Sequence, residues 1–148
     1  MDVVERIAGS EKLLSIFGYW PSFHDAEVLW MRLDRHPHGE GNGPTLEVLV
    51  HAFEMTSEIN PEGYYVLRHQ VLVHMQFREI VELTLDGFNI QNVLWGIEVS
   101  ALPESLQNHR HFDVRFDSSY GVQAAFQCKA VEIVAVTPCT EKGEPIDA

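Results

Sequence analysis

Histidine and carboxylate side chains are the residues of this chain with the greatest capacity for chemistry. The spacing His109-x-His111-x-Asp113 would place three metal-ligand types on one face of an extended segment, and His36-x-His38 forms a second pair. Neither spacing is a zinc motif, since the sequence has no His-Glu-x-x-His and no Cys-x-x-Cys. We therefore expect no metal site and no cofactor. The histidines on predicted strands are interpreted as surface or half-buried residues: His51, His69 and His74.

A second constellation is His24-Asp25-x-Glu27. On an extended chain Asp25 and Glu27 share a face, so that with His24 they could act as general acid and base. The competing interpretation is local, with Asp25 accepting backbone N–H groups where a strand begins. The sequence also lacks a nucleophile elbow and a phosphate-binding loop. We expect no catalysis, and retain a ligand-binding or metal-dependent enzymatic pocket around these three residues as the alternative.

Composition indicates an ordinary globular chain. With 148 residues and 45% hydrophobic side chains, residues 1–148 are expected to form one domain, with a polar tail that frays from about residue 140. The two cysteines, Cys128 and Cys139, are too few for a disulfide scaffold and are interpreted as reduced structural thiols, with a bridge between them as the alternative. The sequence shows no signal peptide and no apolar run of about 20 residues, so we expect a cytoplasmic protein.

Charge is the most informative bulk property. The chain has 10 Lys and Arg against 22 Asp and Glu, a formal net charge of −12. Such a surface repels nucleic-acid phosphates and anionic lipid headgroups, and it accelerates encounter with a basic partner. The sequence therefore argues against nucleic-acid and membrane binding. It leaves the oligomeric state open.

The hydrophobic pattern predicts an α+β fold, mainly a twisted antiparallel sheet of seven or eight strands with one or two short N-terminal helices packed on it. Asp2 and Glu5 have the spacing of a capping box. Ser10 is predicted to cap a helix over residues 11–17, and Gly18 to end it. A hairpin turn is predicted at residues 118–121. The predicted strands are residues 27–35, 45–55, 65–77, 79–85, 93–100, 112–117, 121–126 and 130–136.

The strand at residues 27–35 is apolar on both faces. Leu29, Met31 and Leu33 alternate with Val28 and Trp30, which predicts a central strand covered on both sides for part of its length. Just before this strand, Pro21 favours an extended backbone at the preceding residue. That residue, Trp20, is either a core side chain or an exposed anchor for a partner.

Residues 17–28, Phe-Gly-Tyr-Trp-Pro-Ser-Phe-His-Asp-Ala-Glu-Val, resemble the opening of a family of bacterial immunity proteins, the immunity protein 50-like family of polymorphic toxin systems. Residues 83–92, with the run Leu-Asp-Gly-Phe-Asn-Ile-Gln-Asn, resemble the same family. So do Tyr120-Gly121 and the segment from Phe126-x-Cys128 to Pro138, so the resemblance spans nearly the whole chain.

This resemblance implies a small cytoplasmic protein that binds and neutralises a cognate toxin domain without catalysis. A toxin that cuts nucleic acid is often basic, so the acidic charge of this chain suits the role. We expect the partner to contact Trp20, His24, Asp25, Glu27 and Asp34, with three further acidic residues nearly as plausible: Glu54, Glu58 and Glu62. A structural subunit that oligomerises through an exposed strand edge is a third interpretation.

Overall fold

The computed structural model describes residues 2–35, 43–103 and 110–146. Within them lie one 3-10 helix, η1 (Val3–Arg6), one α-helix, α1 (Glu11–Phe17), and one eight-stranded antiparallel sheet in the order β4-β7-β6-β5-β1-β2-β3-β8. The predicted fold class is confirmed, with a single α-helix beside the 3-10 turn among the described residues. The strands are β1 (Glu27–Asp34), β2 (Thr45–Ile59), β3 (Tyr65–Arg78), β4 (Val81–Asp86), β5 (Val93–Ala101), β6 (Phe112–Tyr120), β7 (Gln123–Cys128) and β8 (Ala130–Pro138).

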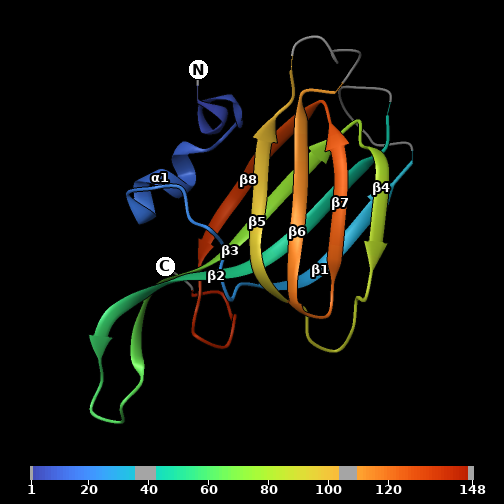
Figure 1. Cartoon of the computed structure of the whole chain (residues 1–148). Coiled ribbons are helices and arrows are strands. Elements are labelled where there is room, and N and C mark those ends of the chain that lie inside the picture. Colours follow the sequence, from blue (N-terminus) through green and yellow to red (C-terminus); the bar gives the residue numbers. More distant parts are fainter. Residues whose placement is uncertain (1, 36–42, 104–109, 147–148) are drawn as a thin grey trace.

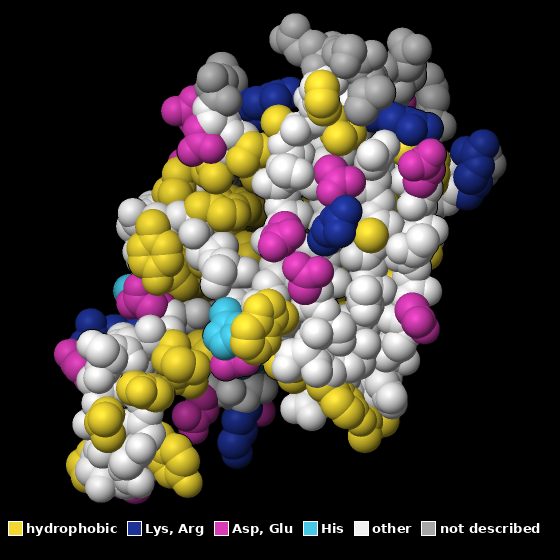
Figure 2. Space-filling view, in the orientation of Figure 1, with side chains coloured by type: hydrophobic (Ala, Val, Ile, Leu, Met, Phe, Trp, Pro, Cys, Tyr) yellow, Lys and Arg dark blue, Asp and Glu magenta, His cyan; other side chains and the backbone are white. Residues whose placement is uncertain are grey.

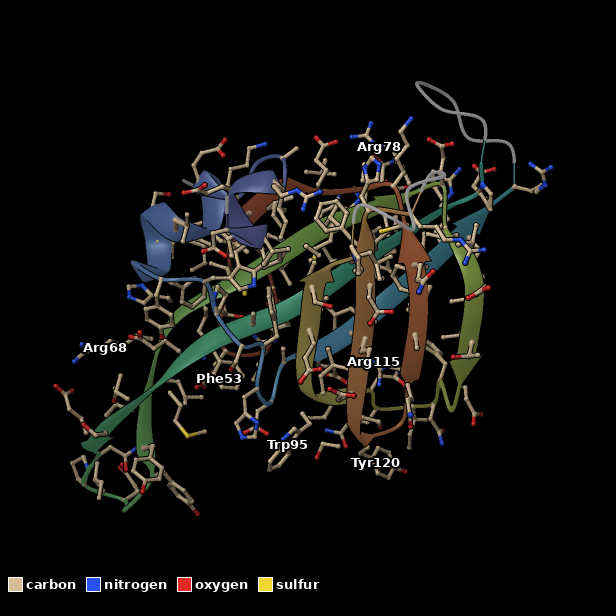
Figure 3. All side chains as sticks on the ribbon, turned by 45° about the horizontal axis from the view of Figure 1, so that its top comes forward. Phe53, Arg68, Arg78, Trp95, Arg115 and Tyr120 are labelled. Carbon is tan, nitrogen blue, oxygen red and sulfur yellow. The ribbon has the colours of Figure 1, made fainter. Side chains whose placement is uncertain are left out.

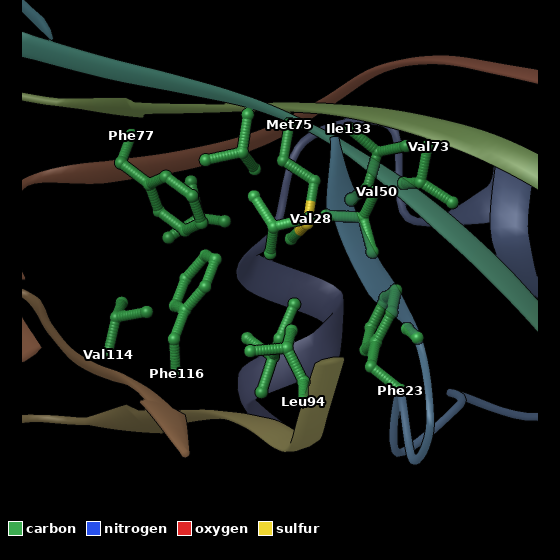
Figure 4. Packing of buried hydrophobic residues seen from close by; sticks show 14 of the residues in the cluster. Phe23, Val28, Val50, Val73, Met75, Phe77, Leu94, Val114, Phe116 and Ile133 are labelled. Atoms are coloured by element: carbon green, nitrogen blue, oxygen red, sulfur yellow. The ribbon is translucent and has the colours of Figure 1, made fainter. Parts of the chain in front are cut away.

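The sheet bends over on itself into two layers. Strands β5, β6, β7 and β4 form the front layer in Figure 1, and β8, β3, β2 and β1 cross behind them. The layers join where β1 meets β5, through a single register pair, Glu27 with Val93. Side chains from both layers fill the space between them (Figure 4). Three rings pack at its centre in edge-on and tilted contacts, with centroids 5.0–6.3 Å apart: Phe77, Phe116 and Phe126.

The N-terminal segment packs beside β8. Ala8 forms a parallel bridge with Glu132, and α1 buries Leu13 and Phe17 in the core. Gly18 ends the helix as predicted, in a left-handed conformation that donates its N–H to a carbonyl of the last turn. The predicted capping box at Asp2 and the predicted cap at Ser10 are both wrong, because neither side chain makes a capping hydrogen bond. No helix within the described ranges is long and apolar enough to cross a bilayer.

Strand β1 is central, but one prediction about it is wrong. A bulge between Val28 and Trp30 shifts the alternation, so that Val28 is buried while Leu29, Trp30 and Leu33 are exposed. The second face of the strand is therefore open to solvent over these residues. An apolar sequence on both faces did not mean that both faces are covered.

Strands β2 and β3 run beyond the sheet as a protruding hairpin, which we call the arm and define as residues 54–68 (Figure 1). The sequence predicted the first of these strands to stop at residue 55, whereas β2 continues to Ile59. A bulge opposite Phe53, with His69 at a φ of 56°, marks the base of the arm. Asn60 ties its tip, since its side-chain oxygen accepts the N–H groups of Glu62 and Tyr64.

Buried Asn92 holds two turns together at the end of the front layer. Its Oδ1 accepts the N–H groups of Asn89 (2.8 Å) and Val122 (3.1 Å), and its Nδ2 donates to the carbonyl of Asn89 (3.0 Å). The hairpin turn predicted at residues 118–121 lies further along, because β6 continues to Tyr120 and the connection is Gly121 and Val122. The three hydrogen bonds of the buried Asn92 amide fix the position at which the chain turns.

The polar tail folds back on the sheet through residue 146. The N–H of Thr140 bonds to the carbonyl of Glu144 (2.8 Å) and the N–H of Ile146 to that of Pro138 (3.0 Å), so this segment is a hydrogen-bonded turn rather than a frayed end. Cys128 and Cys139 are both free and buried, as the sequence analysis expected.

Substituting Gly121 by alanine is expected to destabilise the fold strongly. Gly121 has a φ of 87°, and a Cβ there would clash with the carbonyl oxygen of Gln91 and approach Asn92 Oδ1. We predict a loss of at least about 3 kcal/mol in the free energy of unfolding, measured by urea denaturation. Gly63→Ala is the matched control, since Gly63 has a φ of 90° with open space around it and should cost only about 1 kcal/mol. Equal losses in the two variants would contradict this packing.

Cys128 is expected to be unreactive in the folded protein. Burial raises the pKa of its thiol to about 12, so at pH 8 the thiolate is roughly a thousandfold rarer than for a thiol of ordinary pKa. Burial also raises the pKa of Cys139. We predict very slow reaction with Ellman's reagent in the native state, and two reactive thiols per chain after denaturation without reductant. Rapid native labelling of Cys128 would refute this prediction.

Candidate functional site

The segment that leads into β1 is bonded to β5 through its backbone. The carbonyl of Ser22 accepts the N–H of Ile97 (3.2 Å), Asp25 donates its N–H to Leu94 (2.9 Å), and Leu94 donates in return to Ala26 (2.8 Å). These hydrogen bonds extend the pairing of β1 with β5 toward the N-terminus, before the register pair of Glu27 with Val93. The segment is therefore part of the joint between the layers.

Two residues of this segment adopt left-handed conformations. Phe23 has a φ of 64° and Asp25 a φ of 63°, so the extended backbone that would set Asp25 and Glu27 on one face is not present. Phe23 is buried, and Trp20 packs on it with ring centroids 6.0 Å apart. A bulky buried residue at positive φ is strained unless its surroundings hold it. Trp20 is partly buried against the core, which favours the packing interpretation of this residue.

His24 and Asp25 reach the surface beside Trp95. The imidazole meets the indole edge to face with centroids 4.7 Å apart, and its Nδ1 lies 3.2 Å from the carbonyl oxygen of Trp95. Because a carbonyl only accepts, Nδ1 carries the hydrogen. Nε2 then faces Asp25, 3.6 Å from a carboxylate oxygen. Trp95 is 65% exposed, so an aromatic platform stands next to a histidine and a carboxylate.

Glu27 and Asp34 lie elsewhere. Glu27 accepts the backbone N–H of Asn92 at 3.4 Å, so its carboxylate supports the turn network described above. Asp34 is at the other end of β1, where Arg32 lies 3.4 Å from it. The length of the strand separates these two residues by about 20 Å. Of the five residues expected to contact a partner, the structure therefore brings only His24 and Asp25 together on one exposed surface.

The outer face of β5 and β6 adds carboxylates to this region. Asp113, Arg115 and Asp117 point outward because the alternate residues of β6 are buried, and Glu98 stands opposite Arg115 in the register. Arg115 pairs with Asp113 at 3.4 Å, which leaves the group with a net negative charge. Figure 2 shows these acidic side chains around one basic side chain, next to the histidine and its aromatic neighbour. We call Trp95, His24, Asp25, Glu98 and Asp117 the Trp95 surface.

Trp95 was missed by the sequence analysis. Regular alternation from Val93 would direct Trp95 inward with Ile97. Register shifts on both sides of Leu94 instead bury Leu94 and Ile97 and turn Trp95 out. A bulge leaves no clear signal in a single sequence, although the small Gly96 after the tryptophan is a weak one.

A pocket of about 230 Å³ lies between the loop before β1 and the base of the arm. This volume is below the roughly 300–1,000 Å³ usual for small-molecule sites. His24 lines this pocket, whereas Asp25 and Glu27 do not. Its lining residues are Tyr19, Pro21, Ser22, His24, Phe53, Glu54 and Met55.

Metal-type residues do not converge in the described part of the chain. No three His, Cys, Asp or Glu side chains there are placed to share an ion. Of the spacings considered in the sequence, His36, His38 and His109 lie outside the described residues. His51 instead contacts Gln70 at 2.6 Å, and His74 pairs with Glu47 at 3.0 Å.

A protein-family model matches most of this chain. The family model described as Immunity protein 50 matches residues 9–139. The chain belongs to the Immunity protein 50 family. No curated protein and no solved structure matches.

The motifs that suggested the Immunity protein 50 family are mainly structural here. The segment at residues 21–27 joins the two layers, and residues 86–92 and 121 form the turn network of Asn92. Gly87 approaches the carbonyl of Gly121 so closely that a Cβ would clash. These residues therefore fix the joint between the layers and the turns at the end of the front layer.

Trp95→Ala is expected to leave the fold nearly as stable as the parent chain. Its ring is exposed and its one recorded ring contact among the described residues is His24, so we predict a loss below about 1 kcal/mol in urea unfolding. Phe116→Ala, at a fully buried position, should cost about 3–5 kcal/mol. A loss above about 2 kcal/mol for the tryptophan variant would mean that this residue supports the core.

Proposed function

We propose that this chain is an immunity protein that binds a cognate toxin domain with a basic surface and blocks it without catalysis, acting in the cytoplasm. Membership of the Immunity protein 50 family is the observation that carries this proposal. We expect the toxin to be a nuclease. A nuclease needs a basic patch to hold phosphate groups, and the acidic surface of this chain is complementary to such a patch.

The charge distribution supports a basic partner. Many of the 10 basic side chains are already engaged by carboxylates, so the excess of acid is available at the surface. Complementary charge raises the association rate and disfavours wrong partners. Described Arg and Lys residues that form such ion pairs are Arg32, Arg68, Arg78, Arg110, Arg115 and Lys129.

The Trp95 surface is the proposed centre of contact. An exposed tryptophan ringed by polar and acidic groups has the composition of an interface hot spot. Its indole packs against the His24 ring, a contact that reduces the side-chain entropy lost on binding. Trp20, Glu27 and Asp34 are then secondary, since the first two serve the fold and the third lies at the far end of β1.

The test is co-expression with the toxin domain encoded beside the gene for this chain, followed by affinity measurements at two salt concentrations. We predict rescue of growth and binding that weakens as salt rises. Trp95→Ala should weaken binding by about thirtyfold, mainly through faster dissociation, and Asp25→Asn by about three- to tenfold, mainly through slower association. Asparagine tolerates the left-handed backbone at this position.

Glu11→Gln is the matched control, because it removes one exposed carboxylate from α1, away from the joint. It should change the affinity less than about twofold. Absence of rescue and of binding would refute the immunity role for this toxin. Rescue with unchanged affinity in both Trp95→Ala and Asp25→Asn would keep the role and move the interface elsewhere.

A further inference from the structure

The pocket at the base of the arm has the chemistry of a receptor for one arginine side chain. We propose that it takes an arginine of the toxin, so that this inference rests on the proposed function and names a contact within it.

The walls suit a flat cation. Tyr19 and Phe53 contribute aromatic rings, and Pro21 and Met55 contribute apolar surface. A guanidinium group stacks on such rings and is more weakly hydrated than an ammonium group, so it enters a half-apolar pocket at a lower desolvation cost than lysine. The volume of about 230 Å³ fits a single side chain better than a cofactor.

Glu54 supplies the negative charge. Its carboxylate accepts a hydrogen bond from the Tyr19 hydroxyl at 2.5 Å, and His69 Nε2 lies 3.9 Å away. This hydrogen bond, together with burial and the charge of Glu54, raises the pKa of Tyr19, so the phenol stays a neutral donor. No Lys or Arg pairs with Glu54 within the described segments. Arg68, a basic residue of the same arm, is engaged by Glu58 at 2.8 Å.

The pocket is continuous with the Trp95 surface. His24 lines the pocket and also packs on the indole of Trp95, so one side chain borders both. In the view of Figure 3, Phe53 lies between Arg68 on the arm and Trp95 at the end of the front layer. A toxin seated on Trp95 would thus present neighbouring side chains to the pocket. A second copy of this chain is a poor occupant, because each copy carries a net charge of −12.

The first experiment probes the pocket without the toxin. ¹⁵N-labelled protein is titrated with L-argininamide, and separately with L-lysinamide, while amide shifts are followed. We expect saturable shifts at Glu54 and Met55 with a Kd on the order of millimolar for argininamide, and weaker binding of lysinamide. Glu54→Gln keeps the shape and the oxygen that accepts from Tyr19, and should abolish saturation.

Glu11→Gln is again the control, since Glu11 lies on α1 outside the pocket lining and its substitution changes the net charge by the same amount. It should leave argininamide binding unchanged. No saturable shift in the parent chain, or equal loss in both variants, would overturn the inference. Tighter binding of lysinamide would overturn the choice of arginine.

The second experiment measures toxin affinity in the same two variants. Glu54→Gln should weaken binding at least tenfold through faster dissociation, and Glu11→Gln by less than twofold. If the parent chain binds argininamide but no toxin, the proposed function fails and the pocket chemistry stands. If the toxin binds and both variants bind it equally, the pocket inference fails and the immunity role stands.

Discussion

The pairing of residues 22–28 with β5 is the constraint on which the structure depends. It is a short run of backbone hydrogen bonds, among them Asp25 N–H to Leu94 and Val28 N–H to Asn92, and it is what joins β1 to the front layer. Without it the four strands of each layer would be separate sheets. With it, the single sheet bends, and both inner faces close on the phenylalanine cluster around Phe77. The left-handed residues Phe23 and Asp25 are held in place by this closure.

The same joint creates the exposed surface. Because Phe23 turns into the core, its neighbours His24 and Asp25 are directed outward, where His24 meets Trp95. The bulge on β5 contributes the tryptophan, and the long hairpin of β2 and β3 brings the Glu54 carboxylate to the other side of His24. A rigid joint that presents an aromatic residue among carboxylates is preorganised for binding.

The residues that maintain the fold and the residues exposed for binding occupy different parts of the structure. Asn92, Gly87 and Gly121 are buried or closely packed at turns, and their replacement would be felt throughout the front layer. The arm and the outer face of β5 and β6 carry exposed side chains whose changes cost the fold little. The proposed function would use both properties, a frame that persists and an exposed surface that contacts the toxin.

The sequence by itself determined the antiparallel sheet, the helix over residues 11–17, the Gly18 stop, the free cysteines and the family, because these depend on local periodicity and on residues with special backbone needs. Only the tertiary structure decided which candidate residues meet. Bulges at Leu29, His69 and Trp95 shift the alternation, and a one-residue shift reverses the face of every side chain that follows. Trp95 therefore faces solvent for reasons that local pattern does not contain.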